Sequence, residues 1–181
     1  GNGSRELAGQ TLGIVGYGHL GKTVERIAQA FDMKVLIAER KGQVSIRNDR
    51  TPFEEVLSQS DILSLHCPLT TDTKHLINED TLAAMKPSAM LINTARGDII
   101  NHVALVDALQ NKKIAYAVLD VLEQEPPKQD HPVFAKNLSN LKLTGHIAWA
   151  TEQSQQRLIS EVAENINAFK NGIKRNRIDT L

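Results

Sequence analysis

Short apolar runs alternate with amphipathic stretches along the whole chain. Six of the apolar runs have the length and composition of buried strands, at residues 12–16, 34–38, 61–65, 89–93, 114–120 and 141–144. Alternation of this kind is typical of a parallel sheet covered by helices on both faces. The pattern therefore predicts an α/β fold, a Rossmann-type doubly wound parallel sheet.

Helices are predicted between most of these strands. The first has five apolar residues at helical spacing that are expected to face the sheet: Leu20, Val24, Ile27, Ala28 and Phe31. A second has a clear start signal, because Thr51 can cap it, Pro52 suits its first turn and Glu54 completes a capping box. Residues 78–85 and 101–110 are further predicted helices.

The last third of the chain breaks this rhythm. Residues 124–140 contain Pro126-Pro127 and His131-Pro132 and few apolar residues, which predicts a long loop, and loops of that length are usually functional. A final helix after Trp149 is predicted from apolar residues that share a face, with Asn171-Gly172 as its stop: Leu158, Ile159, Val162, Ile166 and Phe169.

Composition narrows the class of partner. The 21 basic and 21 acidic residues balance, so no overall field attracts nucleic acid or an anionic membrane, and a small-molecule ligand is expected instead. No apolar run is long enough to span a bilayer. The single cysteine, Cys67, excludes an internal disulfide and favours a cytoplasmic location.

A glycine motif lies between the first strand and the first helix. Gly16-Tyr17-Gly18-His19-Leu20-Gly21 has the GxGxxG spacing, in which Gly16 allows a tight turn, Gly18 lets the backbone approach a pyrophosphate and Gly21 lets helix and strand pack closely. The alternative is a chance arrangement of glycines. In this position the motif favours a dinucleotide site.

An acid follows the second strand. Glu39 lies 18 positions after Gly21 (39 − 21), close to the spacing of the acid that binds the adenosine ribose. A carboxylate there favours NAD, because it would repel the 2′-phosphate of NADP. The neighbouring Arg40 and Lys41 leave NADP as the alternative.

Three later strand ends carry groups suited to carbonyl reduction. Arg96 follows the fourth strand, an acidic run from Asp120 to Glu125 follows the fifth, and His146 follows the sixth. A guanidinium can grip a carboxylate, and a histidine held by an acid is a suitable proton donor. Structural salt bridges are the alternative interpretation. His66 is the second candidate base. From the residues alone, His19, His75, His102 and His131 are interpreted as structural or surface residues, and no metal site is expected.

Five motifs together resemble the D-isomer-specific 2-hydroxyacid dehydrogenase family. They are GYGHLG at Gly16, LHCPLT at Leu65, LINTARG at Leu91, LDVLEQEPP at Leu119 and HIAWAT at His146. The resemblance assigns Arg96, Glu125 and His146 as catalytic residues. It also implies cofactor contacts at Gly16, Gly18, His19, Leu20, Gly21, Glu39, Arg40, Cys67, Pro68, Thr73, Thr94, Ala95, Arg96, Asp120, His146 and Ala148.

The resemblance implies a cofactor domain at residues 1–150 and, at residues 151–181, a helix and tail that belong to an otherwise missing substrate domain. The motifs look most similar to glycerate dehydrogenases, which act as hydroxypyruvate reductases, and relatives are commonly homodimers. Phosphoglycerate dehydrogenase remains possible, whereas formate dehydrogenase is disfavoured because that family has glutamine in place of Glu125. We expect this chain alone to bind cofactor and to turn over poorly or not at all.

Several positions depart from the family pattern without removing a catalytic group. Glu39 replaces an aspartate, Asp98 a small residue, Asn101-His102 an acidic pair and Gly145 a proline. An alternative function, in a different class, is an NAD-responsive interaction protein similar to the family's corepressors, because fold and catalytic residues do not separate the two.

Overall fold

A computed structural model describes residues 5–134 and 138–177 of the chain. The chain divides into two compact units, Gly1–Gly145 and His146–Leu181.

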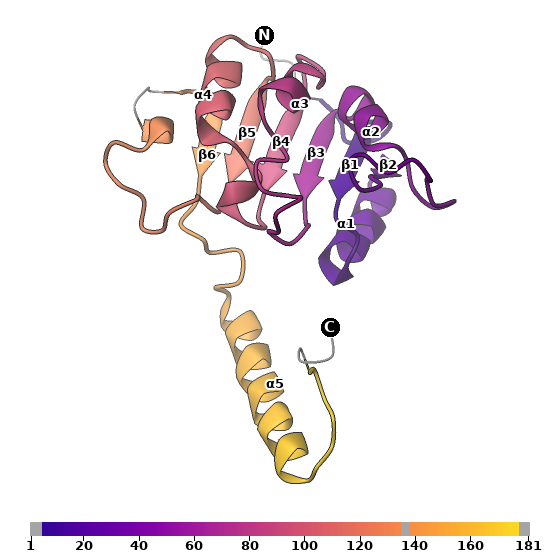
Figure 1. Cartoon of the computed structure of the whole chain (residues 1–181), viewed down its shortest axis with the longest axis vertical. Helices are drawn as coiled ribbons and strands as arrows, with labels where there is room; N and C mark the ends of the chain where they lie inside the picture. The colour runs from indigo at the N-terminus through magenta and orange to yellow at the C-terminus, as the bar shows by residue number, and fades with distance from the viewer. Residues whose placement is uncertain (1–4, 135–137, 178–181) are drawn as a thin grey trace. The chain divides into compact units, whose positions relative to one another are not determined.

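The first unit is built on a six-stranded parallel sheet of order β2-β1-β3-β4-β5-β6 (Figure 1). Its strands are β1 (Thr11–Val15), β2 (Lys34–Ile37), β3 (Ile62–Leu65), β4 (Met90–Asn93), β5 (Tyr116–Leu119) and β6 (Leu141–Leu143). All six lie within or one residue outside the predicted runs. The parallel register, with Ile14 opposite both Ile37 and Ser64, confirms the predicted α/β fold.

Helices connect the strands. They are α1 (His19–Ala30), α2 (Phe53–Gln59), α3 (Glu79–Ala83) and α4 (His102–Gln110), with short 3₁₀ turns η1 (Gly97–Ile99) and η2 (Pro132–Phe134). Asn78 and Asn101 cap α3 and α4, each accepting a hydrogen bond from a backbone amide of the first turn. These helices confirm the predictions for residues 78–85 and 101–110.

The chain winds in two directions from β1. It crosses to β2 through α1 and then returns past β1 to β3 through α2, so right-handed crossovers place α1 and α2 on opposite faces of the sheet. Two separate apolar clusters agree with this arrangement. The smaller one is centred on Leu12, Ile14 and Ala28, and the larger one contains Phe53, Val56 and the residues under α3 and α4.

The prediction that the large apolar residues of α1 face the sheet is partly wrong. Leu20, Ile27 and Phe31 are more than half exposed, whereas Gly21 and Ala28 are buried against the sheet. The large apolar residues and the small residues both recur at helical spacing, on adjacent faces of α1. The small residues allow the helix to approach the sheet more closely. The small residues therefore define the packed face.

The capping box predicted at Thr51 is also wrong. Pro52 occupies the N-cap position of α2 without a side-chain hydrogen bond, one residue later than expected. The backbone of Thr51 instead pairs with the end of β2, accepting from the Glu39 amide and donating to the Ile37 carbonyl. Extension of the sheet by this bridge competes with the cap and displaces the start of the helix.

The predicted loop after β5 contains η2 and packs against α4 through two buried histidines. Both imidazoles contact the Glu123 carboxylate, and the two rings lie edge to face with their centroids 5.3 Å apart. Burial lowers the pKa of His102 to about 4, so its imidazole is neutral near pH 7. Residues 135–137 of this loop lie outside the described residues.

The second unit contains α5 (Glu152–Lys170). Thr151 caps the helix by accepting from the Ser154 amide, and Asn171 followed by Gly172 at φ 69° ends it, as the sequence predicts. The five apolar residues of the predicted face are exposed in this unit. None of the helices within residues 5–134 and 138–177 is long and apolar enough to cross a membrane.

Candidate cofactor and active site

The glycine turn lies where the strand order reverses. Gly16 follows β1 with φ 95°, and a Cβ atom at this position would lie 2.6 Å from Cα of Cys67, which follows β3. A Cβ atom at Gly21 would overlap the carbonyl oxygen of Gly16. Both positions therefore require glycine, one for the turn and close strand approach and the other for helix packing.

Gly18 differs from its two neighbours in the motif. A Cβ atom there would meet nothing within 4 Å, so the backbone borders open space. Gly18 is also the N-cap of the twelve-residue helix α1, whose first turn carries no acidic side chain. The positive end of the helix dipole is uncompensated there and suits a pyrophosphate.

A cleft of about 510 Å³ opens beside this turn. Six of the predicted cofactor residues line it: Gly16, Glu39, Arg40, Cys67, Pro68 and Thr73. Tyr17, Arg47 and Arg50 also line it, and the guanidinium carbon of Arg50 lies 4.5 Å from the centre of the Tyr17 ring. The lining combines the carboxylates of Glu39 and Asp72, several cations, and four apolar residues: Val15, Ala38, Phe53 and Leu76.

Glu39 is the buried acid of this cleft. Its carboxylate accepts hydrogen bonds from Nε and Nη2 of Arg47, at 2.8 and 2.6 Å, and from the Arg40 amide at 2.8 Å. These partners, the Arg47 side chain above all, lower the pKa of Glu39 to about 2. No sequence pattern predicts the role of Arg47, because its pairing with Glu39 lies within an irregular segment that has no periodic signal.

Arg96 lies in the turn after β4. Asn93 holds this turn by donating to the Arg96 carbonyl and accepting from the Ala95 amide, both at 2.9 Å. The Arg96 side chain is exposed, and its Nη1 donates to the Ala95 carbonyl at 2.6 Å. The buried asparagine fixes the backbone, so the guanidinium projects from a defined position.

The turn that carries Glu125 packs directly on the Arg96 turn. Glu125 Oε1 accepts from the Leu122 amide at 3.0 Å. A Cβ atom at Gly97 would overlap the backbone of Leu122 and Glu123, so the two turns touch through their main chains. The structure therefore brings the Arg96 and Glu125 turns together at the carboxyl edge of the sheet.

Four further residues considered for the site, Asp120, His146, Ala148 and His66, do not line the cleft. Asp120 accepts from Thr144 Oγ1 at 2.5 Å, which links the ends of β5 and β6. His146, at φ 54°, and Ala148 belong to the second unit, and their roles stay predictions. The alternative base His66 lies 2.9 Å through Nε2 from Ser64 Oγ, and burial lowers the pKa of its imidazole.

A doubly wound sheet, a glycine turn at its switch point and a buried acid after β2 define a dinucleotide-binding domain. Residues 2–148 match the model of the D-isomer specific 2-hydroxyacid dehydrogenase, NAD binding domain. The chain belongs to this family, and the predicted resemblance and its NAD cofactor are confirmed.

Similar proteins agree with this assignment. The chain is 42% identical over 174 residues to a glycerate dehydrogenase of Methylorubrum extorquens, covering 96% of this chain and 54% of that protein. It is 39% identical to a hydroxypyruvate reductase of Blautia hydrogenotrophica, covering 92% and 52%. The NAD-complexed D-isomer specific 2-hydroxyacid dehydrogenase of Lactobacillus delbrueckii matches with a TM-score of 0.82 and 32% identity, covering 96% and 57%. The chain spans about half the length of these relatives.

Proposed function

We propose that the protein containing this chain reduces a small 2-oxo acid to a D-2-hydroxy acid with NADH, with hydroxypyruvate and glycerate as the favoured pair. The observation that carries the proposal is the packing of the Arg96 turn on the Glu125 turn at the same sheet edge as the cofactor cleft. An arginine and a carboxylate beside a dinucleotide site suit a carboxylate-bearing carbonyl substrate.

Each side chain has a distinct task in this proposal. Arg96 binds the substrate carboxylate in bidentate fashion and polarises the adjacent carbonyl. His146 donates a proton to the carbonyl oxygen, and Glu125 orients the imidazole for this transfer. Bound NADH supplies the hydride. Thr94, Ala95, Asp120 and Ala148 complete the cofactor contacts.

The wider organisation is part of the same proposal. Residues 1–150 act as the cofactor domain, and residues 151–181 as a helix and tail that complete a substrate domain. We further propose a small-molecule substrate and no nucleic-acid or membrane partner, supported by the balanced charge of the chain. A cytoplasmic location follows from the single cysteine, and a homodimer from the family resemblance. The relatives found are dehydrogenases and reductases, and nothing supports the NAD-responsive interaction protein considered above.

Steady-state kinetics of the full-length protein test the proposal. NADH oxidation is measured with hydroxypyruvate, glyoxylate, pyruvate and 3-phosphohydroxypyruvate. We expect turnover to be highest with hydroxypyruvate, and Arg96→Gln to lower kcat/KM by a factor of about 100 or more with a much smaller effect on NADH affinity. A full-length protein that binds NADH but reduces none of the four acids contradicts the proposal.

A second measurement concerns the 181-residue chain by itself. We expect it to bind NADH, detected by enhanced nicotinamide fluorescence, and to show little turnover, because closure of a substrate domain excludes water during reduction. Turnover of hydroxypyruvate by this chain at the rate of the full-length protein would overturn the assignment of residues 151–181 to an incomplete domain.

A further inference from the structure

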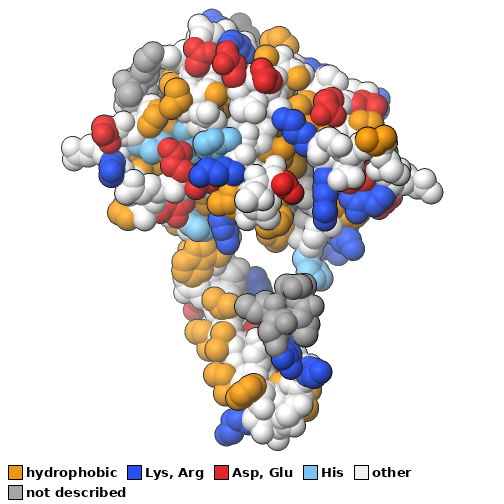
Figure 2. Space-filling model, in the orientation of Figure 1, with side chains coloured by type: hydrophobic (Ala, Val, Ile, Leu, Met, Phe, Trp, Pro, Cys, Tyr) orange, Lys and Arg blue, Asp and Glu red, His pale blue; other side chains and the backbone are white. Residues whose placement is uncertain are grey.

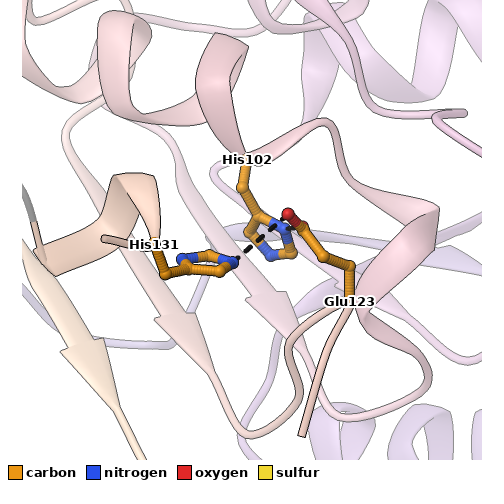
Figure 3. A group of neighbouring side chains, drawn as sticks. All are labelled: His102, Glu123 and His131. Atoms are coloured by element: carbon orange, nitrogen blue, oxygen red, sulfur yellow. Dashed lines mark hydrogen bonds and ion pairs between the residues drawn. The ribbon is translucent and has the colours of Figure 1, made fainter. Parts of the chain in front are cut away.

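Three potential metal ligands meet on the α4 side of the sheet, each from a different element. His102 is the first residue of α4, Glu123 lies in the loop after β5, and His131 immediately precedes η2. Figure 3 shows the Glu123 carboxylate beside the His102 ring, with His131 next to both, and the centroids of the two imidazoles are 5.3 Å apart. The fold thus brings together two nitrogen donors and one carboxylate. The first and last of these residues are 29 positions apart in the sequence (131 − 102).

The distances among the donor atoms suit a single small ion. One donor atom from each residue lies within 4.8 Å of the others. Nε2 of His131 lies 3.3 Å from Oε1 of Glu123, which matches the roughly 3.3 Å between two ligands at about 2.0 Å from a tetrahedral zinc ion. His102 and Glu123 are in direct contact through Nδ1 and Oε2, and this pair must open to admit an ion.

Burial leaves these histidines with unused polar atoms. The side chain of His102 is fully buried and that of His131 is 5% exposed, whereas Glu123 is 36% exposed. Within residues 5–134 and 138–177, Nε2 of His102 has no hydrogen-bond partner, and Nε2 of His131 makes no hydrogen bond beyond its ion-pair contact with Glu123. Buried polar atoms without a partner are costly, and in native structures such atoms often indicate a missing water or ion.

We propose that His102, Glu123 and His131 bind one divalent transition-metal ion of the zinc class. Two imidazoles and one carboxylate form a donor set that suits Zn²⁺, Co²⁺ or Ni²⁺, whereas Mg²⁺ and Ca²⁺ take mainly oxygen ligands. The exposed side of Glu123 gives the ion a route in and leaves a fourth position for water.

Binding requires a proton to move within His131. The Val133 amide lies 3.3 Å from Nδ1 of His131 and donates to it, so in the metal-free protein the neutral ring carries its proton on Nε2. An ion at Nε2 needs the lone pair of that atom, so the proton transfers to Nδ1 and the contact with the Val133 amide is exchanged for another. The Val133 amide is therefore a local reporter of metal binding.

The role assigned to the ion is structural. It would join the irregular loop after β5 to the first turn of α4 and so restrict the loop that also carries Glu125. None of the three ligands lines the cofactor cleft, so the site does not depend on the proposed dehydrogenase activity.

The test is a titration of the tag-free, chelator-treated chain with Co²⁺ followed by visible absorbance and by backbone amide NMR. We expect about one ion per chain, absorption bands typical of low-coordinate Co²⁺, a shift of the Val133 amide signal and competition by Zn²⁺. Glu123→Gln, at a partly exposed position, and His131→Asn are each expected to weaken binding at least tenfold. The control variant His19→Gln removes an exposed imidazole in α1 and is expected to bind like wild type.

Other outcomes would overturn the site. Binding that is equal in wild type and Glu123→Gln, or that disappears in His19→Gln, would place the ion elsewhere. An unshifted Val133 amide at saturating Co²⁺ would do the same. If His131→Asn does not fold, as judged by circular dichroism, the Glu123→Gln titration and the wild-type NMR spectrum still decide the proposal.

Discussion

Arg47 donates two hydrogen bonds to Glu39, at 2.8 and 2.6 Å, at the edge of the cofactor cleft. Glu39 is buried, whereas the Arg47 side chain is 56% exposed. The pair holds the carboxylate of Glu39 ionised and oriented where the adenosine ribose of a dinucleotide would lie.

Glu39 is expected to set the preference for NADH over NADPH. Glu39→Ala removes the charge that repels a 2′-phosphate and frees Arg47 to bind one, so the ratio of the two dissociation constants is expected to shift by about tenfold or more towards NADPH. Fluorescence titration of the chain with each cofactor measures this ratio. Glu55→Ala, on the exposed side of α2, is the matched control and should leave the ratio unchanged. An unaltered preference in Glu39→Ala would assign discrimination to Arg40 and Lys41.

The same pair is expected to make stability depend on pH. The folded-state pKa of Glu39 is about 2, below its ordinary value of 4.5, because Arg47 stabilises the ionised form. Folding therefore gains stability from this group above pH 4.5, and the gain is lost as the pH falls from 4.5 towards 2. Urea unfolding at pH 5 and pH 3 measures the effect. The midpoint of wild type should fall more steeply over this interval than that of Glu39→Gln, and parallel decreases would show that Glu39 is not the titrating group.

Gly16 and Gly18 are expected to respond differently to the same substitution. Gly16→Ala forces a side chain onto a residue at φ 95° and against the backbone of Cys67, so it is expected to lower the free energy of unfolding by about 2–4 kcal/mol. Gly18→Ala meets open space and is expected to change stability by less than about 1 kcal/mol while weakening NADH binding about tenfold, because its methyl group occupies the pyrophosphate position. Urea unfolding and fluorescence titration separate the two effects. Equal losses of stability in both variants would contradict the assigned roles.

The sequence predicts the sheet well because buried parallel strands are continuous apolar runs between polar segments. Lys34–Ile37 and Ile62–Leu65 were both located in this way, and Asn78 and Asn101 mark the starts of two helices. The capping box predicted at Thr51 does not form, because this local signal competes with a backbone bridge between Thr51 and Ala38 at the end of β2. Local sequence patterns therefore predict helices and strands, but they do not predict where a backbone bridge displaces the start of a helix.

The candidate site was predictable where a motif holds its residues together. Gly16 and Glu39 belong to one βαβ unit with characteristic spacing, and both line the cleft. The contact of Arg47 with Glu39 depends on the path of an irregular segment of backbone. The cluster of His102, Glu123 and His131 forms only because a loop packs on α4. No short-range spacing indicates either arrangement, so both emerge only from the three-dimensional structure.

Gly97 is expected to be required for the geometry of the Arg96 turn. A Cβ atom there would overlap the carbonyl carbon of Leu122 and the amide nitrogen of Glu123, and these are backbone atoms that cannot rotate away. Gly97→Ala must therefore separate the two turns, at an expected cost of about 2–4 kcal/mol in the free energy of unfolding. Gly145→Ala, where nothing lies within 4 Å, is the matched control and should be nearly neutral.

In the full-length protein, a correctly folded Gly97→Ala should keep its affinity for NADH and lose turnover, because Arg96 moves while the cleft around Gly16 and Glu39 does not. Full turnover in that variant would show that the close contact between the two turns does not position Arg96.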